Sequence, residues 1–142
     1  MNEAKGGGPE VLIVAGSESD RAVVEKVEKV LRDAGVEYEF EVASAHRTPD
    51  RVAELARGAE ARGIKVLIAA AGLAAALPGV MAAHSRLPVI GLPVAAGALR
   101  GIDALLAIAQ MPPGVPVATV GIDAGANAAH LALRILGRSP AL

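Results

Sequence analysis

The sequence predicts an α/β domain in which helices cover both faces of a five-stranded parallel sheet. Two observations predict it. Short apolar runs alternate along the chain with segments in which apolar residues recur at helical spacing. Runs such as Val11–Ala15 and Val66–Ala71 are apolar at consecutive positions, which is typical of parallel strands buried on both faces. Because parallel strands need a crossover connection, each helix is expected to link one strand to the next.

The first half of the chain holds two strand–helix units after a lead-in. Residues 1–9 end in three glycines and a proline, so they are expected to be flexible, with one domain over residues 10–142. Thr48, Pro49 and Asp50 predict a helix start, with a capping hydroxyl, a proline at the first position and an acid in the first turn. The expected elements are strands at 11–15 and 38–43 and helices at 23–34 and 49–63, ending near Gly35 and Gly63.

The second half continues the alternation, although residues 66–85 carry no formal charge and could be taken for a membrane span. Gly72 and Pro78–Gly79 interrupt this interval, so a strand, a turn and a short helix are expected there, and no membrane association. The expected elements are strands at 66–71, 88–92 and 115–122 and helices at 78–85, 102–110 and 124–136.

The charge balance excludes several classes of protein. The 142 residues include 14 Lys and Arg against 15 Asp and Glu, for a formal net charge of −1. This argues against a nucleic-acid-binding protein, because phosphate binding needs clustered positive charge. The absence of cysteine excludes disulfides and a thiolate nucleophile and is compatible with a reducing cytosol. One Tyr, one Phe and no Trp leave little surface for stacking a flavin or a base.

The apolar content points to self-association. Hydrophobic residues make up 53% of the chain, and alanine is the commonest of them. The expected helices at 78–85 and 102–110 have too few polar residues to form one fully wet face. We therefore expect these helices to be buried between subunits of a homo-oligomer.

The turn after the first strand, Gly16 to Asp20, has the composition of an anion site. Glycine allows close approach of the backbone, Ser17 and Ser19 offer hydroxyls, and the next helix presents free N–H groups. Asp20 could accept a hydrogen bond from a sugar hydroxyl. The alternative is that Ser17 or Ser19 only caps the helix.

The turn after the second strand reads Ser44-Ala45-His46-Arg47 and is the strongest candidate for chemistry. Arginine at a helix N-terminus is a good partner for phosphate. Histidine ordinarily titrates near neutrality, so His46 suits proton transfer. The alternative is an exposed loop with no such role.

The other candidates carry less information. The third turn, Ala69 to Gly79, offers backbone N–H groups and a dry wall but no acid or base, and tight packing would explain it equally well. His84 and His130 lie on helical segments and are expected to be structural or interface residues. No histidine pair has metal-ligand spacing, so we expect no metal site.

Together, these segments resemble a known family. The first turn is similar to the G-S-x-S-D motif, and residues 44–49 to the S-A-H-R-T-P motif, of the class I aminoimidazole ribonucleotide carboxylases of purine biosynthesis. These enzymes are formally N5-carboxyaminoimidazole ribonucleotide mutases. The resemblance covers residues 11 to about 137 without obvious gaps. It continues at Leu77-Pro78-Gly79, at Leu87–Gly91, at Gln110-Met111-Pro112, at Gly114–Val120 and at Ala126–Ala129.

The resemblance implies a three-layer, flavodoxin-like α/β/α sandwich, assembled as a cytoplasmic homo-octamer. It implies a ribonucleotide substrate, whose carboxylate moves from the exocyclic N5 to C4 of the imidazole without metal or organic cofactor. His46 would be the general acid and base. Ser17, Ser44 and Arg47 would hold the phosphate, and Asp20 the ribose hydroxyls. Ser19, Ala45, Gly72, Ala76 and Leu77 would complete the substrate site, with the loop from Ala70 to Leu77 closing over the imidazole and CO2.

The chain departs from the family pattern mainly in the third turn. Ala76 replaces a second active-site histidine, and Ala70 and Leu73 replace glycines, which adds side-chain volume where the ligand should lie. Arg21 stands where an aromatic residue is frequent, and Ala95-Ala96-Gly97 where serines are more usual.

Three hypotheses follow from these departures. The chain is a mutase with a simplified loop; or a relative with another substrate, similar to the carboxylase-like domain of nickel-pincer cofactor biosynthesis; or a non-catalytic scaffold, engineered or degenerate, that keeps the fold and the octamer. The mutase is the first of these hypotheses. The composition of the first two helices and the Gly-rich N-terminus are the observations behind an engineered origin.

Overall fold

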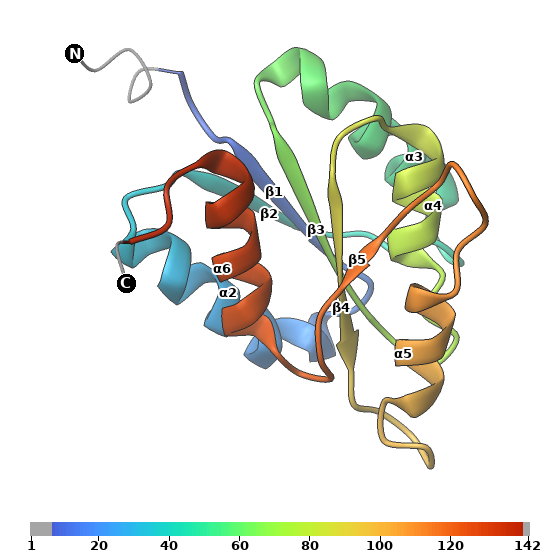
Figure 1. Ribbon diagram of the computed structural model, residues 1–142. Coiled ribbons are helices and arrows are strands. Elements are labelled where there is room, and N and C mark those ends of the chain that lie inside the picture. Colours follow the sequence, from blue (N-terminus) through green and yellow to red (C-terminus); the bar gives the residue numbers. More distant parts are fainter. Residues whose placement is uncertain (1–6, 141–142) are drawn as a thin grey trace.

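A computed structural model describes residues 7–140 and has a five-stranded, wholly parallel sheet in the order β2-β1-β3-β4-β5 (Figure 1). The predicted fold class is confirmed. The strands are β1 (Val11–Ala15), β2 (Tyr38–Val42), β3 (Val66–Gly72), β4 (Val89–Val94) and β5 (Ala118–Thr119). The α-helices are α2 (Arg21–Asp33), α3 (Pro49–Ala59), α4 (Leu77–His84), α5 (Ile102–Ala109) and α6 (Gly125–Leu136), and two short 3-10 helices are η1 (Glu18–Asp20) and η2 (Glu60–Arg62).

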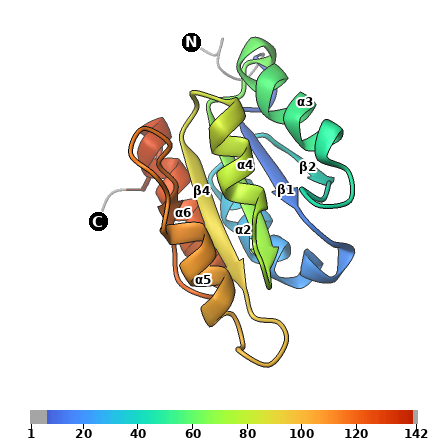
Figure 2. The ribbon, with the colours of Figure 1, turned by 90° about the vertical axis from the view of Figure 1, so that its right-hand side faces the viewer.

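Two hydrophobic cores flank the sheet and make the three layers. Ile13 and Ile68 point to one side, where α2 and α6 cover the sheet. Leu12 and Leu67 point to the other side, where α3, α4 and α5 lie (Figure 2). Every residue of β1 is fully buried, as the continuous apolar run predicts.

The last strand is much shorter than predicted. The expected strand at 115–122 is reduced to Ala118–Thr119, which pairs only with Ile90 and Gly91 of β4. Pro116 cannot donate a ladder hydrogen bond, and an edge position provides partners on one side only. Conversely, β4 runs on to Val94 beyond its expected end.

Two other predictions concern the ends and the apolar interval. Residues 1–6 of the predicted flexible lead-in lie outside the described residues. The uncharged interval 66–85 forms β3 and α4. Among residues 7–140, no helix has both the length and the apolar character needed to cross a membrane.

The strand order determines where a ligand site can form. The chain moves from β1 outward to β2 and then returns to the other side of β1 to form β3. In open parallel sheets, such a reversal leaves a crevice at the carboxyl ends of the strands on either side of it. The loops that follow β1, β2 and β3 therefore meet at one place.

Candidate active site

A cavity of about 480 Å³ lies at this reversal point. The loops that follow the first four strands build it. Its volume and its position at the carboxyl ends of the strands are those expected of a small-molecule site. All the residues that the sequence predicts for the site line it: Ser17, Ser19, Asp20, Ser44, Ala45, His46, Arg47, Gly72, Ala76 and Leu77.

The first turn combines a cap with a polar wall. The Ser17 Oγ accepts a hydrogen bond from the Ser19 backbone N–H at 3.2 Å, and the two hydroxyl oxygens are 2.9 Å apart. The Gly16 N–H donates to the Ala70 carbonyl at 3.1 Å, which fixes this turn to the end of β3. Ser17 therefore caps η1, as the structural alternative supposed, while both serines still line the cavity.

Asp20 is a buried acidic residue in the cavity wall, and the residue is only 6% exposed. Burial raises the pKa of this group above its usual value, because the charged form loses solvent. A hydrogen bond from the Ser17 backbone lowers the pKa, and the charge of Asp123 raises it. Asp20 is therefore a polar group with little solvent contact in the wall of the cavity.

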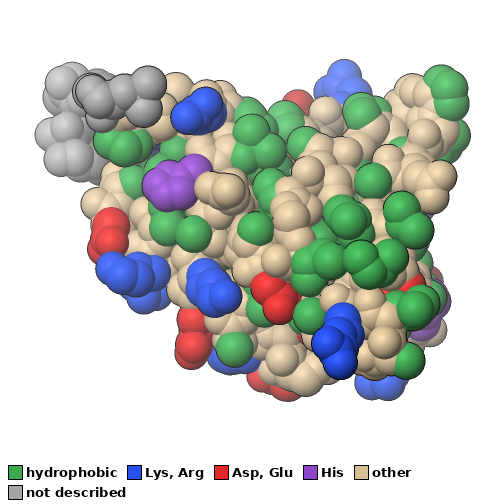
Figure 3. Space-filling model, turned by 60° about the horizontal axis from the view of Figure 1, so that its bottom comes forward, with side chains coloured by type: hydrophobic (Ala, Val, Ile, Leu, Met, Phe, Trp, Pro, Cys, Tyr) green, Lys and Arg blue, Asp and Glu red, His purple; other side chains and the backbone are tan. Residues whose placement is uncertain are grey.

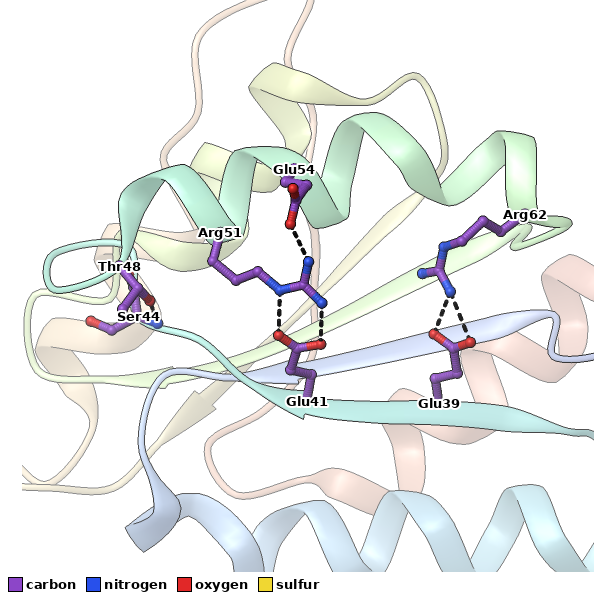
Figure 4. Close-up of polar contacts among 7 residues, drawn as sticks. All are labelled: Glu39, Glu41, Ser44, Thr48, Arg51, Glu54 and Arg62. Atoms are coloured by element: carbon purple, nitrogen blue, oxygen red, sulfur yellow. Dashed lines mark hydrogen bonds and ion pairs between the residues drawn. The ribbon is translucent and has the colours of Figure 1, made fainter.

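The second turn is closed by its own side chains. The Ser44 Oγ accepts hydrogen bonds from the backbone N–H groups of His46 at 3.3 Å and Arg47 at 3.1 Å. The Thr48 Oγ1 accepts from the Ser44 N–H at 3.0 Å and donates to the Ser44 carbonyl at 3.2 Å (Figure 4). The predicted helix start is confirmed, because α3 begins at Pro49 with Thr48 at its N-cap position and Asp50 in its first turn. The expected capping bond from the Thr48 hydroxyl is absent, because this hydroxyl bonds to Ser44 instead.

His46 and Arg47 are the reactive and cationic groups of the turn. Both side chains are exposed, and within residues 7–140 neither the imidazole nor the guanidinium has a hydrogen-bond or ion-pair partner. They protrude from a backbone that is held by Ser44 and Thr48. This arrangement leaves an imidazole and a guanidinium without protein partners, among the described residues, at the wall of the cavity.

The third loop differs from the sequence interpretation in one respect. Ala70 does not add volume to the cavity, because it is fully buried in the core under α2 and α6. Leu73 does line the cavity, with a φ of 55°, a backbone conformation that favours glycine. Ala76 lies at the N-cap position of α4 and leaves its side of the cavity apolar.

One residue that lines the site and one that supports its wall were not predicted by sequence reasoning. Ala96, from the loop after β4, lines the cavity next to Gly72. Asp123, from the loop after β5, accepts a hydrogen bond from Ala95 and so supports that wall from outside. The position of Ala96 after a strand could have indicated it, whereas the contact of Asp123 spans 28 residues and has no local signal.

The remaining histidines lie apart from the cavity. His84 ends α4 and His130 lies on α6, each beside a different surface hollow. In the described part of the chain, no three His, Cys, Asp or Glu side chains cluster as metal ligands would. Among the histidines of residues 7–140, His46 alone lines the cavity.

Comparisons with known proteins show the family to which the chain belongs. A family model described as AIR carboxylase matches residues 10–141. The N5-carboxyaminoimidazole ribonucleotide mutase of Pyrococcus abyssi is 60% identical over 132 residues, which cover 93% of this chain and 76% of the relative. The protein of the same name from Thermotoga maritima is 53% identical and aligns with 91% of this chain and 75% of its own. The crystal structure of Treponema denticola PurE matches with a TM-score of 0.82 and 33% identity, over 91% of this chain and 80% of that one. The chain therefore belongs to the AIR carboxylase family.

Proposed function

We propose that this protein is an N5-carboxyaminoimidazole ribonucleotide mutase. The observation that carries the proposal is the convergence of His46, Arg47, Ser44 and Asp20 on one cavity. Relatives that share more than half of their aligned residues with this chain bear the same name. The substrate class is an anionic ribonucleotide, and its phosphate would lie against Arg47 and the serine hydroxyls.

The geometry supports a reaction in two proton transfers. His46, as imidazolium, donates its proton to N5 as the bond from N5 to the carboxylate carbon breaks. This releases CO2 and leaves the neutral amine. C4 of the imidazole then attacks CO2, and His46 removes the proton from C4, which restores the imidazolium. No net proton is consumed, so one titrating group is sufficient.

The apolar third loop suits the intermediate stage of this reaction. CO2 must remain near C4 until it is recaptured, and alanine side chains offer it neither nucleophile nor charge. Ala71, Ala74, Ala75 and Ala76 line this part of the cavity. The open volume of about 480 Å³ also favours an active site over the scaffold hypothesis, which expects the loop to fill the pocket.

The proposal includes assembly into a cytoplasmic homo-oligomer, with an octamer as the expected form. Leu99, Ile102 and Leu106 are 59%, 51% and 51% exposed, and all belong to α5 or the loop before it. Figure 3 views the end of the molecule that carries the loops after the strands and shows hydrophobic side chains gathered on its right half. Surface of this kind is typical of a subunit interface.

An activity assay tests the enzyme proposal. N5-carboxyaminoimidazole ribonucleotide is supplied, and formation of its C4-carboxylated isomer is followed by ultraviolet absorbance, for the wild type, His46→Asn and His130→Asn. Turnover is expected in the wild type and in the His130→Asn control, and loss of about 100-fold or more in His46→Asn. Turnover only with aminoimidazole ribonucleotide and CO2 would indicate a carboxylase instead. No turnover with either substrate from a folded protein would overturn the enzyme proposal and favour the scaffold.

A further inference from the structure

A bidentate ion pair lies at the base of the turn that carries His46. The Arg51 guanidinium of α3 donates from Nε to one oxygen of Glu41 on β2 at 2.6 Å and from Nη2 to the other at 2.8 Å. Its remaining nitrogen, Nη1, contacts Glu54 one turn further along α3 (Figure 4). Two parallel bonds from a planar guanidinium fix direction as well as distance.

The position of this pair along the chain is what matters. Glu41 comes shortly before Ser44, and Arg51 comes shortly after Thr48, so the pair joins two residues ten positions apart that flank the turn. Inside that loop, Ser44 and Thr48 close a second, smaller ring through their own hydrogen bonds. His46 and Arg47 lie in the inner ring, whose two ends continue into β2 and α3, the two elements that the Glu41–Arg51 pair joins.

A second ion pair also joins β2 to the helical layer above it, but it does not flank the His46 turn. Arg62 in η2 donates from Nη1 to both oxygens of Glu39 on β2, at 2.6 and 2.8 Å. The two pairs are similarly exposed, at 45% and 34% for Arg51 and Glu41 and 42% and 40% for Arg62 and Glu39. The second pair joins residues 23 positions apart at the far end of the helix and leaves the His46 turn untouched (Figure 4).

We propose that the Glu41–Arg51 pair is a positioning device, which holds the His46 and Arg47 turn at a fixed angle between β2 and α3. The kinetic part of this inference rests on the proposed mutase function, while the structural part does not. A half-exposed ion pair contributes little to global stability, so its main effect is expected to be local. The pKa of Glu41 lies below its usual value, mainly because of the hydrogen bonds from Arg51, so the pair is fully charged near neutral pH.

Matched variants distinguish positioning from a merely structural role. Glu41→Gln, Arg51→Gln and the double variant are compared with Glu39→Gln, Arg62→Gln and their double variant, at a temperature far below unfolding. The first set is expected to lose about 10- to 100-fold in kcat/KM, with the double variant no worse than the single ones. The second set is expected to keep wild-type kinetics. Arg51→Lys retains the positive charge but not the planar guanidinium that donates two parallel hydrogen bonds. Its activity is therefore expected to lie between those of Arg51→Gln and the wild type.

A second readout does not depend on activity. Amide hydrogen exchange is measured at the N–H groups of His46, Arg47 and Thr48 in Glu41→Gln and in Glu39→Gln. Faster exchange at these amides in Glu41→Gln alone is the expected result. Equal kinetics in the two sets of an enzyme whose wild type turns over, or unchanged exchange in Glu41→Gln, would overturn the positioning proposal. Faster exchange in a protein whose wild type has no mutase turnover would instead uphold the positioning and refute only the mutase.

Discussion

The Asp123 carboxylate accepts a hydrogen bond from the backbone N–H of Ala95, with 2.9 Å between Oδ1 and the nitrogen. The Asp123 N–H also donates to the Pro93 carbonyl at 2.8 Å, so this residue is attached to the end of β4 at two points. The next residue in that loop, Ala96, lines the cavity. Asp123 adopts a φ of 59°, which asparagine and aspartate tolerate better than most residues. The wall of the site therefore depends on a residue outside it.

Two substitutions at Asp123 distinguish the contribution of its hydrogen bond to stability from that of its charge. Asp123→Asn keeps an acceptor and a tolerated backbone, so its free energy of unfolding is expected to stay within about 0.5 kcal/mol of the wild type. Asp123→Ala loses the hydrogen bond and leaves alanine at positive φ, with an expected loss of about 1–3 kcal/mol. Urea unfolding measures the free energy of unfolding of both variants. Equal stability of the two would contradict a stabilising role for the hydrogen bond of Asp123.

Leu73 is strained where the family pattern has glycine. Its φ of 55° disfavours a β-carbon, and its side chain is 54% exposed, so it gains little from burial. Leu73→Gly is expected to raise the free energy of unfolding by roughly 0.5–1 kcal/mol, as the relieved strain exceeds the entropic cost of glycine. Leu99→Gly, at an exposed leucine without positive φ, should give no gain. Thermal unfolding compares them, and a loss in Leu73→Gly equal to that in Leu99→Gly would refute the strain.

These two residues mark what the sequence can and cannot predict. Local pattern is enough for β1 and for the turns after strands, so the fold class is confirmed and the predicted site residues meet at one cavity. The conformation at Leu73 and the contact of Asp123 with Ala95 depend on the packing of separate loops, which periodicity does not encode. The same holds for the hydroxyl of Thr48, whose partner is a turn residue and not the helix end. The catalytic role of His46 remains a prediction.

The buried carboxyl of Asp20 predicts a pH dependence of stability. Its pKa is raised in the folded protein above the ordinary value of 3.8, so between the two values the folded state holds a proton that the unfolded state releases. Stability therefore falls as the pH rises through that window. Asp20→Asn lacks this fall and is expected to be more stable than the wild type at neutral pH but not below pH 3.8.

Urea unfolding across a pH series checks this prediction. Each tenfold difference in the acid dissociation constant between the folded and unfolded protein corresponds to about 1.4 kcal/mol. Asp50→Asn, at an exposed carboxylate in the first turn of α3, serves as the control and should show no such gain at neutral pH. A parallel pH profile for Asp20→Asn and the wild type would exclude a raised pKa at this carboxyl.

The exposed face of α5 predicts how the proposed homo-oligomer can be dissociated. Ile102 and Leu106 are one helical turn apart, and each is 51% exposed, so they present a continuous apolar surface on one side of the helix. Glutamate at both positions would place two charges in any interface built there, at a cost of several kcal/mol for each buried and unpaired charge. The variant Ile102→Glu with Leu106→Glu is expected to sediment as a smaller species with unchanged helix content. Ile135→Glu, at an exposed isoleucine on α6 across the sheet, is expected to sediment like the wild type. A wild type that sediments as a monomer at micromolar concentration would refute self-association, and equal dissociation by Ile135→Glu would place the interface elsewhere.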